Sequence, residues 1–243
     1  MISKNQLKQI RALGQKKQRK AEQAFLVQGE KNVLELLASD MITRALFVTA
    51  DFAETHAKAL TNIEHTIADE ADLAKASTLV SNNAAIAIVK MPKAQEINPD
   101  RFLIALDQVS DPGNLGTIIR LADWYGIKQV VLSANCADPY NPKTISATMG
   151  SFTRVECIQT NLVEFLAAFP HPKYGAFLQG ENVHKTEFGD LGVLVMGSES
   201  HGISAEAESF ITDKVTIPSF GGAESLNVAI ATGIILDNVK RSQ

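Results

Sequence analysis

The sequence predicts an α/β fold in two parts, and three observations support this prediction. Short apolar runs that suit strands alternate with segments of helical periodicity along the chain. The alternation stops once, at residues 92–100, where two prolines and several polar residues show no periodicity. The later runs Phe102–Leu106 and Val193–Met196 are apolar throughout, which is typical of a parallel sheet buried on both faces. We therefore expect a domain over residues 1–91, a linker over 92–100 and a second domain over 101–243.

In the first part, Ser3 is expected to cap a helix whose apolar residues Leu7, Ile10 and Leu13 recur at helical spacing. Short strands and helices then alternate, which indicates a small layered α/β domain. The expected elements are a strand at Phe25–Val27, a helix at Lys31–Leu37, a strand at Ala45–Thr49, helices at Ala53–Leu60 and Ala71–Leu79, and a strand at Ala84–Val89.

In the second part, the alternation restarts more strongly, as expected for a sheet covered by helices. The expected strands are Phe102–Leu106, Gln129–Ser133, Tyr174–Leu178, Val193–Met196 and Lys214–Ile217. The expected helices are Leu115–Tyr125, Thr144–Phe152, Leu162–Phe169, Ala205–Phe210 and Ser225–Lys240.

Composition excludes several classes of protein. The chain has 243 residues, of which 45% are hydrophobic and 21% charged, so it is neither disordered nor fibrous. No apolar run approaches the ~20 residues that span a bilayer, and the polar, basic N-terminus does not resemble a secretory signal. Two cysteines cannot form a disulfide framework. A reducing, cytoplasmic location is therefore expected.

The charge is distributed unevenly. Residues 1–20 hold seven Lys or Arg and no acidic residue, whereas the whole chain has a net charge of −4. A basic end on an acidic body is expected where one end meets a polyanion, although a solvated helical face explains the same pattern.

Several common chemical motifs are missing from the sequence. It contains no P-loop, no Gly-x-Gly-x-x-Gly turn, no Cys-x-x-Cys and no His-Glu-x-x-His, and its five histidines are scattered. Nucleotide binding through those loops is therefore not predicted, and no metal site is expected.

Instead, three polar, glycine-bearing segments follow expected strands, at residues 106–120, 195–204 and 217–229. In open α/β sheets, ligands bind at the carboxyl ends of strands. We therefore expect the three segments to converge on one crevice.

In the first segment, Asn114 is expected to cap a helix, and Gly116 permits close approach of a ligand or backbone. Arg120 lies in an apolar run and so needs a partner for its charge. One possible partner is a carboxylate, Asp123 or Glu199, in a structural salt bridge. The other is a bound phosphate, whose oxygens suit the donors of a guanidinium.

In the second segment, Gly-Ser-Glu-Ser-His-Gly superficially resembles the nucleophile elbow of serine hydrolases, but its spacing is one residue too long. Glu199 is suited to orient an arginine or accept a proton, or simply to cap the next helix. In the third, Glu224 or Ser225 is expected to cap the final helix, which places Asn227 in a first turn that suits an anion.

Taken together, the three segments resemble the motifs of the SpoU/TrmH group of SPOUT methyltransferases. The order and spacing agree over roughly residues 102–240, with serine at 198 and 200 where the family usually has asparagine and glycine. The matching residues are Asn114, Gly116 and Arg120 in the first motif, Gly197, Glu199 and Gly202 in the second, and Ile217, Pro218 and Ser225–Val228 in the third.

The resemblance implies an S-adenosylmethionine-dependent RNA methyltransferase that transfers a methyl group to a ribose 2′-hydroxyl. It implies a trefoil-knotted α/β domain, a homodimer, and an essential Arg120 that holds the phosphate beside the target ribose. The motif residues implied to position the reactants are Asn114, Glu199, Ser225 and Asn227, and those implied to line the cofactor pocket are Leu178, Gly197, Ile217 and Leu226.

The first part resembles the family's substrate-binding domain, a small α/β fold related to RNA-binding ribosomal proteins, through Phe25–Lys31 and the strand Ala84–Val89. This layout favours rRNA over tRNA as substrate. It also gives the basic end a task, the binding of RNA phosphates by Lys16, Lys17, Arg19 and Lys20.

Three alternatives remain open at this stage. A tRNA methyltransferase fits the same motifs. The two serines, Ser198 and Ser200, favour a non-catalytic RNA-binding protein that retains the fold. A metabolite hydrolase using Ser200 is the third.

Overall fold

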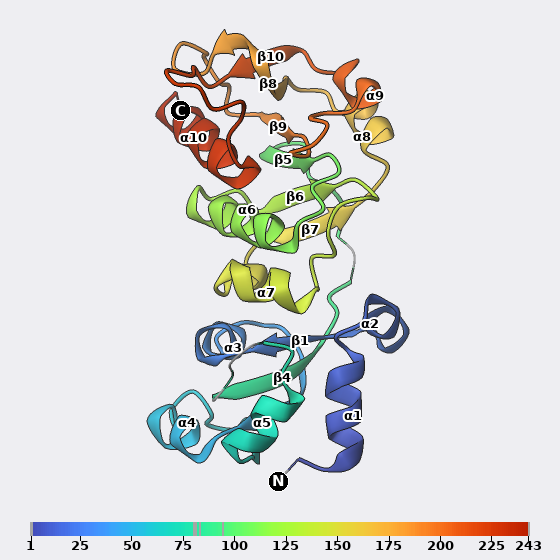
Figure 1. Ribbon diagram of the computed structural model, residues 1–243, viewed down its shortest axis with the longest axis vertical. Coiled ribbons are helices and arrows are strands. Elements are labelled where there is room, and N and C mark those ends of the chain that lie inside the picture. Colours follow the sequence, from blue (N-terminus) through green and yellow to red (C-terminus); the bar gives the residue numbers. More distant parts are fainter. Residues whose placement is uncertain (1, 80–81, 83, 94, 243) are drawn as a thin grey trace. The chain divides into compact units, whose positions relative to one another are not determined.

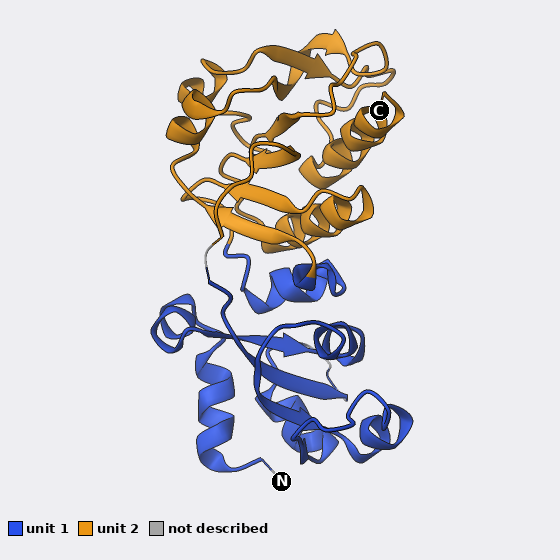
Figure 2. Ribbon diagram, turned by 180° about the vertical axis from the view of Figure 1, so that it is seen from behind, with its two compact units in different colours: residues 1–93, 138–153 blue, residues 94–137, 154–243 orange. Residues whose placement is uncertain are grey.

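The computed structural model describes residues 2–79, 82, 84–93 and 95–242. The chain divides into two compact units, coloured separately in Figure 2. Unit 1 comprises residues 1–93 together with 138–153, and unit 2 comprises residues 94–137 together with 154–243. The chain therefore passes from one unit to the other three times.

Unit 1 is built around a mixed four-stranded sheet in the order β1-β4-β2-β3, in which only β2 and β3 run parallel. Its elements are α1 (Lys4–Ala12), α2 (Lys16–Glu22), β1 (Ala24–Gln28), α3 (Glu30–Leu37), β2 (Thr43–Val48), α4 (Ala50–Thr55), β3 (Thr66–Ile67), α5 (Glu70–Ala76), β4 (Ala85–Lys90), α7 (Pro142–Thr148) and the 3-10 turn η1 (Ser151–Thr153) (Figure 1).

Both faces of this sheet are covered. Along β1, Phe25 and Val27 enter one apolar cluster while Ala24 and Leu26 enter another, as the two-residue period of a strand requires. Helices α3, α4 and α7 contribute to the first cluster, and α1 and α5 to the second. The expected Ser3 cap is confirmed, because its side chain accepts a hydrogen bond from the Gln6 amide.

Unit 2 contains six parallel strands in the order β10-β8-β9-β5-β6-β7, which confirms the predicted parallel sheet. Its elements are β5 (Phe102–Leu106), α6 (Pro112–Trp124), β6 (Gln129–Leu132), β7 (Glu156–Gln159), α8 (Leu162–Ala168), β8 (Lys173–Asn182), β9 (Gly192–Met196), α9 (Ala205–Glu208), β10 (Asp213–Thr216) and α10 (Val228–Arg241) (Figure 1).

The central strands of unit 2 are buried on both faces. In β5, Ile104 and Leu106 belong to a cluster shared with α6 and α10, while Leu103 and Ala105 belong to one shared with α8 and α9. This arrangement explains why the sequence of β5 shows no alternation of apolar and polar residues.

The 16 residues between β6 and β7 that belong to unit 1, residues 138–153, are called the crossover segment below. Ile145 of this segment lies in the cluster with β1, and the rings of Tyr140 and Phe152 lie 4.8 and 6.2 Å from the ring of Phe25. A helix expected at Thr144–Phe152 is shorter, because Met149 and Gly150 have φ values of 52° and 101° and end it. The connection between two strands of unit 2 thus completes the core of unit 1.

Three elements were not predicted. Helix α2 has no apolar stripe, β3 has two residues, and β7 is a four-residue edge strand without a continuous apolar run. The final helix begins at Val228 and not at Ser225, because Asn227 caps it.

Candidate functional site

The three glycine-bearing segments follow β5, β9 and β10 of unit 2. All strands of this sheet run parallel, so the three segments leave the same edge of it. Strands β5 and β9 are direct neighbours, with Leu106 beside Met196 at their carboxyl ends. The fold therefore places the first two segments next to each other.

A chain of side-chain hydrogen bonds joins all three segments. The Nδ2 atom of Asn114 donates to Oε1 of Glu199, and the Oδ1 atom of Asn114 accepts from Nδ2 of Asn227 at 3.0 Å. Asn114 thus stands between the second and third segments and contacts both. The structure brings these three candidate residues together.

Helix capping explains why Asn114 is available for this role. Asp111 caps α6 by accepting from the Asn114 amide at 2.8 Å, so the side chain of Asn114 is not used as the cap. Asn227 caps α10 instead, since its Oδ1 accepts from the amides of Ala229 and Ile230 at 3.0 and 3.3 Å. The expectations that Asn114 caps α6 and that Glu224 or Ser225 caps the last helix are therefore wrong.

The segment after β9 forms a narrow turn. Ser198 and Gly202 exchange two main-chain hydrogen bonds of 3.0 and 2.9 Å, and Gly202 has a φ of 68°. A Cβ at Gly197 would overlap main-chain atoms of Gly202 and Ile203. Glycine is therefore required at 197 if the turn is to close as it does.

Asp107 fixes the far end of the same turn, and sequence reasoning did not single it out. Its carboxylate is buried, with 3% of the residue exposed, and accepts from the Ser204 amide at 2.8 Å. Its own amide donates to the Met196 carbonyl at 2.8 Å. An acidic residue directly after a fully apolar strand was the signal that pointed to it.

Arg120 is placed differently from expectation. Its neighbours Ile118 and Ile119 are buried, but helical geometry turns Arg120 to the exposed side of α6. In the described part of the chain it forms no ion pair, because Asp123 pairs with Arg154 at 2.9 Å and Glu199 holds Asn114. Neither structural salt bridge considered from sequence is present, and the guanidinium is accessible to an anion from outside.

The candidate cofactor residues differ in their exposure. Leu178 is 78% exposed and Leu226 47% exposed, whereas Ile217 is half-buried against the core of unit 2. Ser225 is exposed. Large apolar side chains exposed beside polar, glycine-bearing turns suit a ligand with both apolar and charged parts, so these residues fit S-adenosylmethionine.

The four basic residues assigned to RNA also separate into two kinds. Lys16, Lys17 and Lys20 are exposed on α2. Arg19 is 1% exposed, and its Nη2 forms an ion pair with Asp138 Oδ2 at 2.6 Å. Its guanidinium is thus not accessible to a phosphate, and its assignment to RNA binding does not fit the structure.

Two further properties concern the described residues only. None of their helices is both long and apolar enough to cross a membrane. No group of three or more His, Cys, Asp or Glu side chains among them is placed to hold a metal ion.

Comparisons with known proteins assign each part of the chain to a family. The SpoU rRNA Methylase family matches residues 101–237, and the MRM3-like substrate binding domain matches residues 4–87. The chain is 32% identical to the 23S rRNA (guanosine(2553)-2′-O)-methyltransferase RlmP of Bacillus subtilis, over 98% of this chain and 97% of the relative.

Two solved structures are similar over nearly the whole chain. An RNA methyltransferase structure assigned to the TrmH family, from Porphyromonas gingivalis, superposes with a TM-score of 0.89 at 38% identity and covers 100% of both chains. An AdoMet-bound rRNA methyltransferase from Sinorhizobium meliloti superposes with a TM-score of 0.87 at 29% identity, over 99% of this chain and 97% of the other.

The parallel six-stranded sheet and its joined loops define a methyltransferase of the SPOUT class. The chain belongs to the SpoU rRNA methylase family and carries an MRM3-like substrate-binding domain. It is an rRNA ribose 2′-O-methyltransferase that uses S-adenosylmethionine. The predicted fold class, activity and cofactor are confirmed.

Proposed function

We propose that this enzyme methylates a ribose 2′-hydroxyl in 23S rRNA and that the residues joined through Asn114 form its catalytic centre. The hydrogen-bonded chain Glu199–Asn114–Asn227 carries the proposal, because it unites the three segments that resemble the family motifs. The substrate follows from RlmP, whose name specifies 23S rRNA and which matches the chain from end to end. Two similar solved structures of tRNA enzymes each cover 60% of this chain, whereas RlmP covers 98% of it, which favours rRNA over tRNA.

The cofactor would lie against Leu178, Gly197, Ile217 and Leu226, where it supplies an electrophilic methyl group. The main chain of the turn after Gly197 would offer hydrogen-bond partners to the polar groups of the cofactor. The exposed side chains of Leu178 and Leu226 would offer it an apolar wall. The knotted path of the chain, implied by the family resemblance, would set these segments side by side.

Arg120 would hold the phosphate next to the target ribose and stabilise the 2′-oxygen as it gains negative charge during attack. Its exposed guanidinium, free of ion pairs within the described chain, suits this role. Because a guanidinium stays protonated in proteins, the proton of the 2′-hydroxyl goes to another acceptor. Asn114, Glu199, Ser225 and Asn227 would hold the reactants in line, and alignment of this kind supplies much of the acceleration.

RNA would first be bound by unit 1. Lys16, Lys17 and Lys20 are exposed on α2, on a chain whose first 20 residues hold no acidic side chain. Such contacts with phosphates are independent of sequence and weaken with salt. They would position the RNA, and the centre in unit 2 would act on it.

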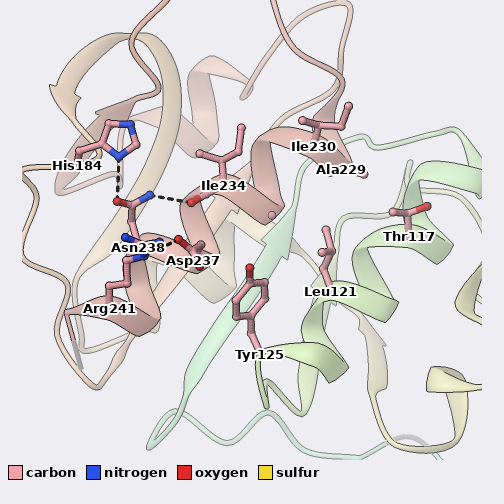
Figure 3. Close-up of a pocket in the computed structure, with 11 residues that line it drawn as sticks. Thr117, Leu121, Tyr125, His184, Ala229, Ile230, Ile234, Asp237, Asn238 and Arg241 are labelled. Atoms are coloured by element: carbon pink, nitrogen blue, oxygen red, sulfur yellow. Dashed lines mark hydrogen bonds and ion pairs between the residues drawn. The ribbon is translucent and has the colours of Figure 1, made fainter.

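The enzyme would work in the cytoplasm as a homodimer. In unit 2, residues of α6 and α10 line a groove of about 570 Å³, among them Leu121, Ala229 and Ile234 (Figure 3). Trp124 and Ile230 on the same two helices are 82% and 57% exposed. Apolar side chains so exposed suit the same face of a second copy.

The test is to incubate the purified protein with labelled S-adenosylmethionine and 23S rRNA from cells that lack the gene, and to map 2′-O-methyl marks by mass spectrometry. We expect label at one ribose with the wild-type protein. We expect Arg120→Ala to lose this label while it retains its affinity for the cofactor. Failure to bind S-adenosylmethionine would favour the non-catalytic RNA-binding alternative, and label confined to tRNA would refute the substrate.

A further inference from the structure

The buried ion pair between Arg19 and Asp138 in unit 1 has no part in the proposed function so far. Arg19 lies in α2 among exposed lysines but is itself 1% exposed. Its Nη1 donates to the carbonyls of Leu13 and Gly14 at 2.9 and 2.8 Å, and its Nη2 donates to Asp138 at 2.6 Å. One guanidinium thus joins the end of α1, helix α2 and the first residue of the crossover segment.

Asp138 is held equally firmly. Its Oδ2 accepts from Arg19, while its Oδ1 accepts from the Tyr140 amide at 3.0 Å. Its carbonyl accepts from Oγ1 of Thr144, a fully buried residue, at 3.1 Å. The position of Asp138 is therefore determined by several bonds within unit 1.

The residue before Asp138 is bound to the loop of the first motif in unit 2. The Ala137 amide donates to the Val109 carbonyl at 2.9 Å. Val109 lies two residues before Asp111, the cap of α6 whose side chain fixes the Asn114 amide. A continuous series of covalent and hydrogen bonds thus leads from Arg19 to Asn114.

Stability alone does not account for a charged pair at this place. Well-packed apolar residues usually stabilise a buried site as well as an ion pair does, because burying two charges costs much of their attraction. What an arginine fork with three oxygen partners adds is a single defined geometry.

We propose that Arg19 and Asp138 are a positioning pair for methyl transfer, and the proposal rests on the function proposed above. The pair fixes the RNA-binding helix α2 to the crossover segment, and the crossover segment continues directly into the residue that binds the first-motif loop. Lysines of α2 that bind RNA are thereby linked, through the bonds of Arg19 and Asp138 and the chain that follows, to the loop that carries Asn114.

The test separates RNA binding from transfer. Two glycines inserted between Ala137 and Asp138 leave the ion pair intact but loosen its connection to unit 2. The rate of single-turnover methyl transfer to 23S rRNA, at saturating RNA and S-adenosylmethionine, should fall at least tenfold. The dissociation constants for RNA and for S-adenosylmethionine should each stay within about threefold of wild type. The matched control inserts two glycines between Pro92 and Lys93, where the rate should stay within twofold.

A second variant acts on the pair itself. Asp138→Asn keeps the size of the side chain but removes its charge, and should slow single turnover while RNA affinity is retained. A merely structural role would lower the melting temperature and leave the rate per folded enzyme unchanged. The proposal would be overturned if the Ala137–Asp138 insertion and Asp138→Asn both transferred methyl groups at the wild-type rate. If the wild-type protein itself transferred no methyl group to RNA, the proposed function and this inference would both be refuted.

Discussion

Replacement of Gly197 by alanine should disrupt the turn after β9 without disturbing the rest of the fold. The added Cβ would overlap main-chain atoms of Gly202 and Ile203, which cannot move aside as a flexible side chain does. The turn must then open, and the two main-chain hydrogen bonds between Ser198 and Gly202, 3.0 and 2.9 Å long, are lost. At about 1 kcal/mol net for each bond, the loss is about 2 kcal/mol, or roughly 30-fold in an equilibrium constant.

The assay is equilibrium binding of labelled S-adenosylmethionine, because Gly197 is proposed to line the cofactor site. We expect the dissociation constant of Gly197→Ala to rise roughly 30-fold. Gly221→Ala is the matched control, since a Cβ there meets nothing within 4 Å, and its affinity should stay within twofold. Equal affinities of the two variants would refute the reasoning. The melting temperature of each variant shows whether unit 2 remains folded.

Three other predictions follow from the structure. Asn114→Ala removes the link between Glu199 and the third segment and should lower kcat/KM 10- to 100-fold, from the loss of two side-chain hydrogen bonds worth about 0.5–1.5 kcal/mol each. Asn114→Asp should lower it further, because it sets a carboxylate against Glu199. Replacing Lys16, Lys17 and Lys20 by Gln should reduce the salt dependence of RNA binding by a slope of about two, and an unchanged slope would contradict their assignment. Burial raises the pKa of Cys157 to about 12, so iodoacetamide at pH 9 should modify this half-buried thiol far more slowly in native than in unfolded protein. The free energy of unfolding should fall between pH 9 and 11, because the unfolded chain loses a thiol proton that the folded chain keeps.

Much of unit 2 was predictable because its signals are local. Five apolar residues in a row at β5 and four at β9 indicate strands buried on both faces, and both strands are buried. The order of the strands was not predictable, since no local pattern records that β8 pairs with β10. The convergence of the three segments was inferred from the parallel strands, and the hydrogen bonds of Asn114 are consistent with it.

The basic N-terminus shows where sequence reasoning fails. Lys16, Lys17, Arg19 and Lys20 look equivalent in a helix without an apolar stripe. What distinguishes Arg19 is an acidic partner 119 residues away and two main-chain carbonyls. The acidic partner is not visible until the crossover segment is known to belong to unit 1. The presence of arginine at 19, among lysines, was the only sequence signal of a structural role. Only the planar guanidinium donates hydrogen bonds to three oxygens in a fixed geometry.

The bonds of the candidate site also have a direction. The first amides of α10 donate to Asn227, Asn227 donates to Asn114, and Asn114 donates to Glu199. Each asparagine accepts with its oxygen and donates with its nitrogen, whereas an ionised carboxylate only accepts and a hydroxyl must do both through a single oxygen. The chain thus runs from the positive end of a helix to a carboxylate, and each bond favours the next. This requirement explains amides at positions 114 and 227 better than helix capping does, because aspartate or serine caps a helix equally well.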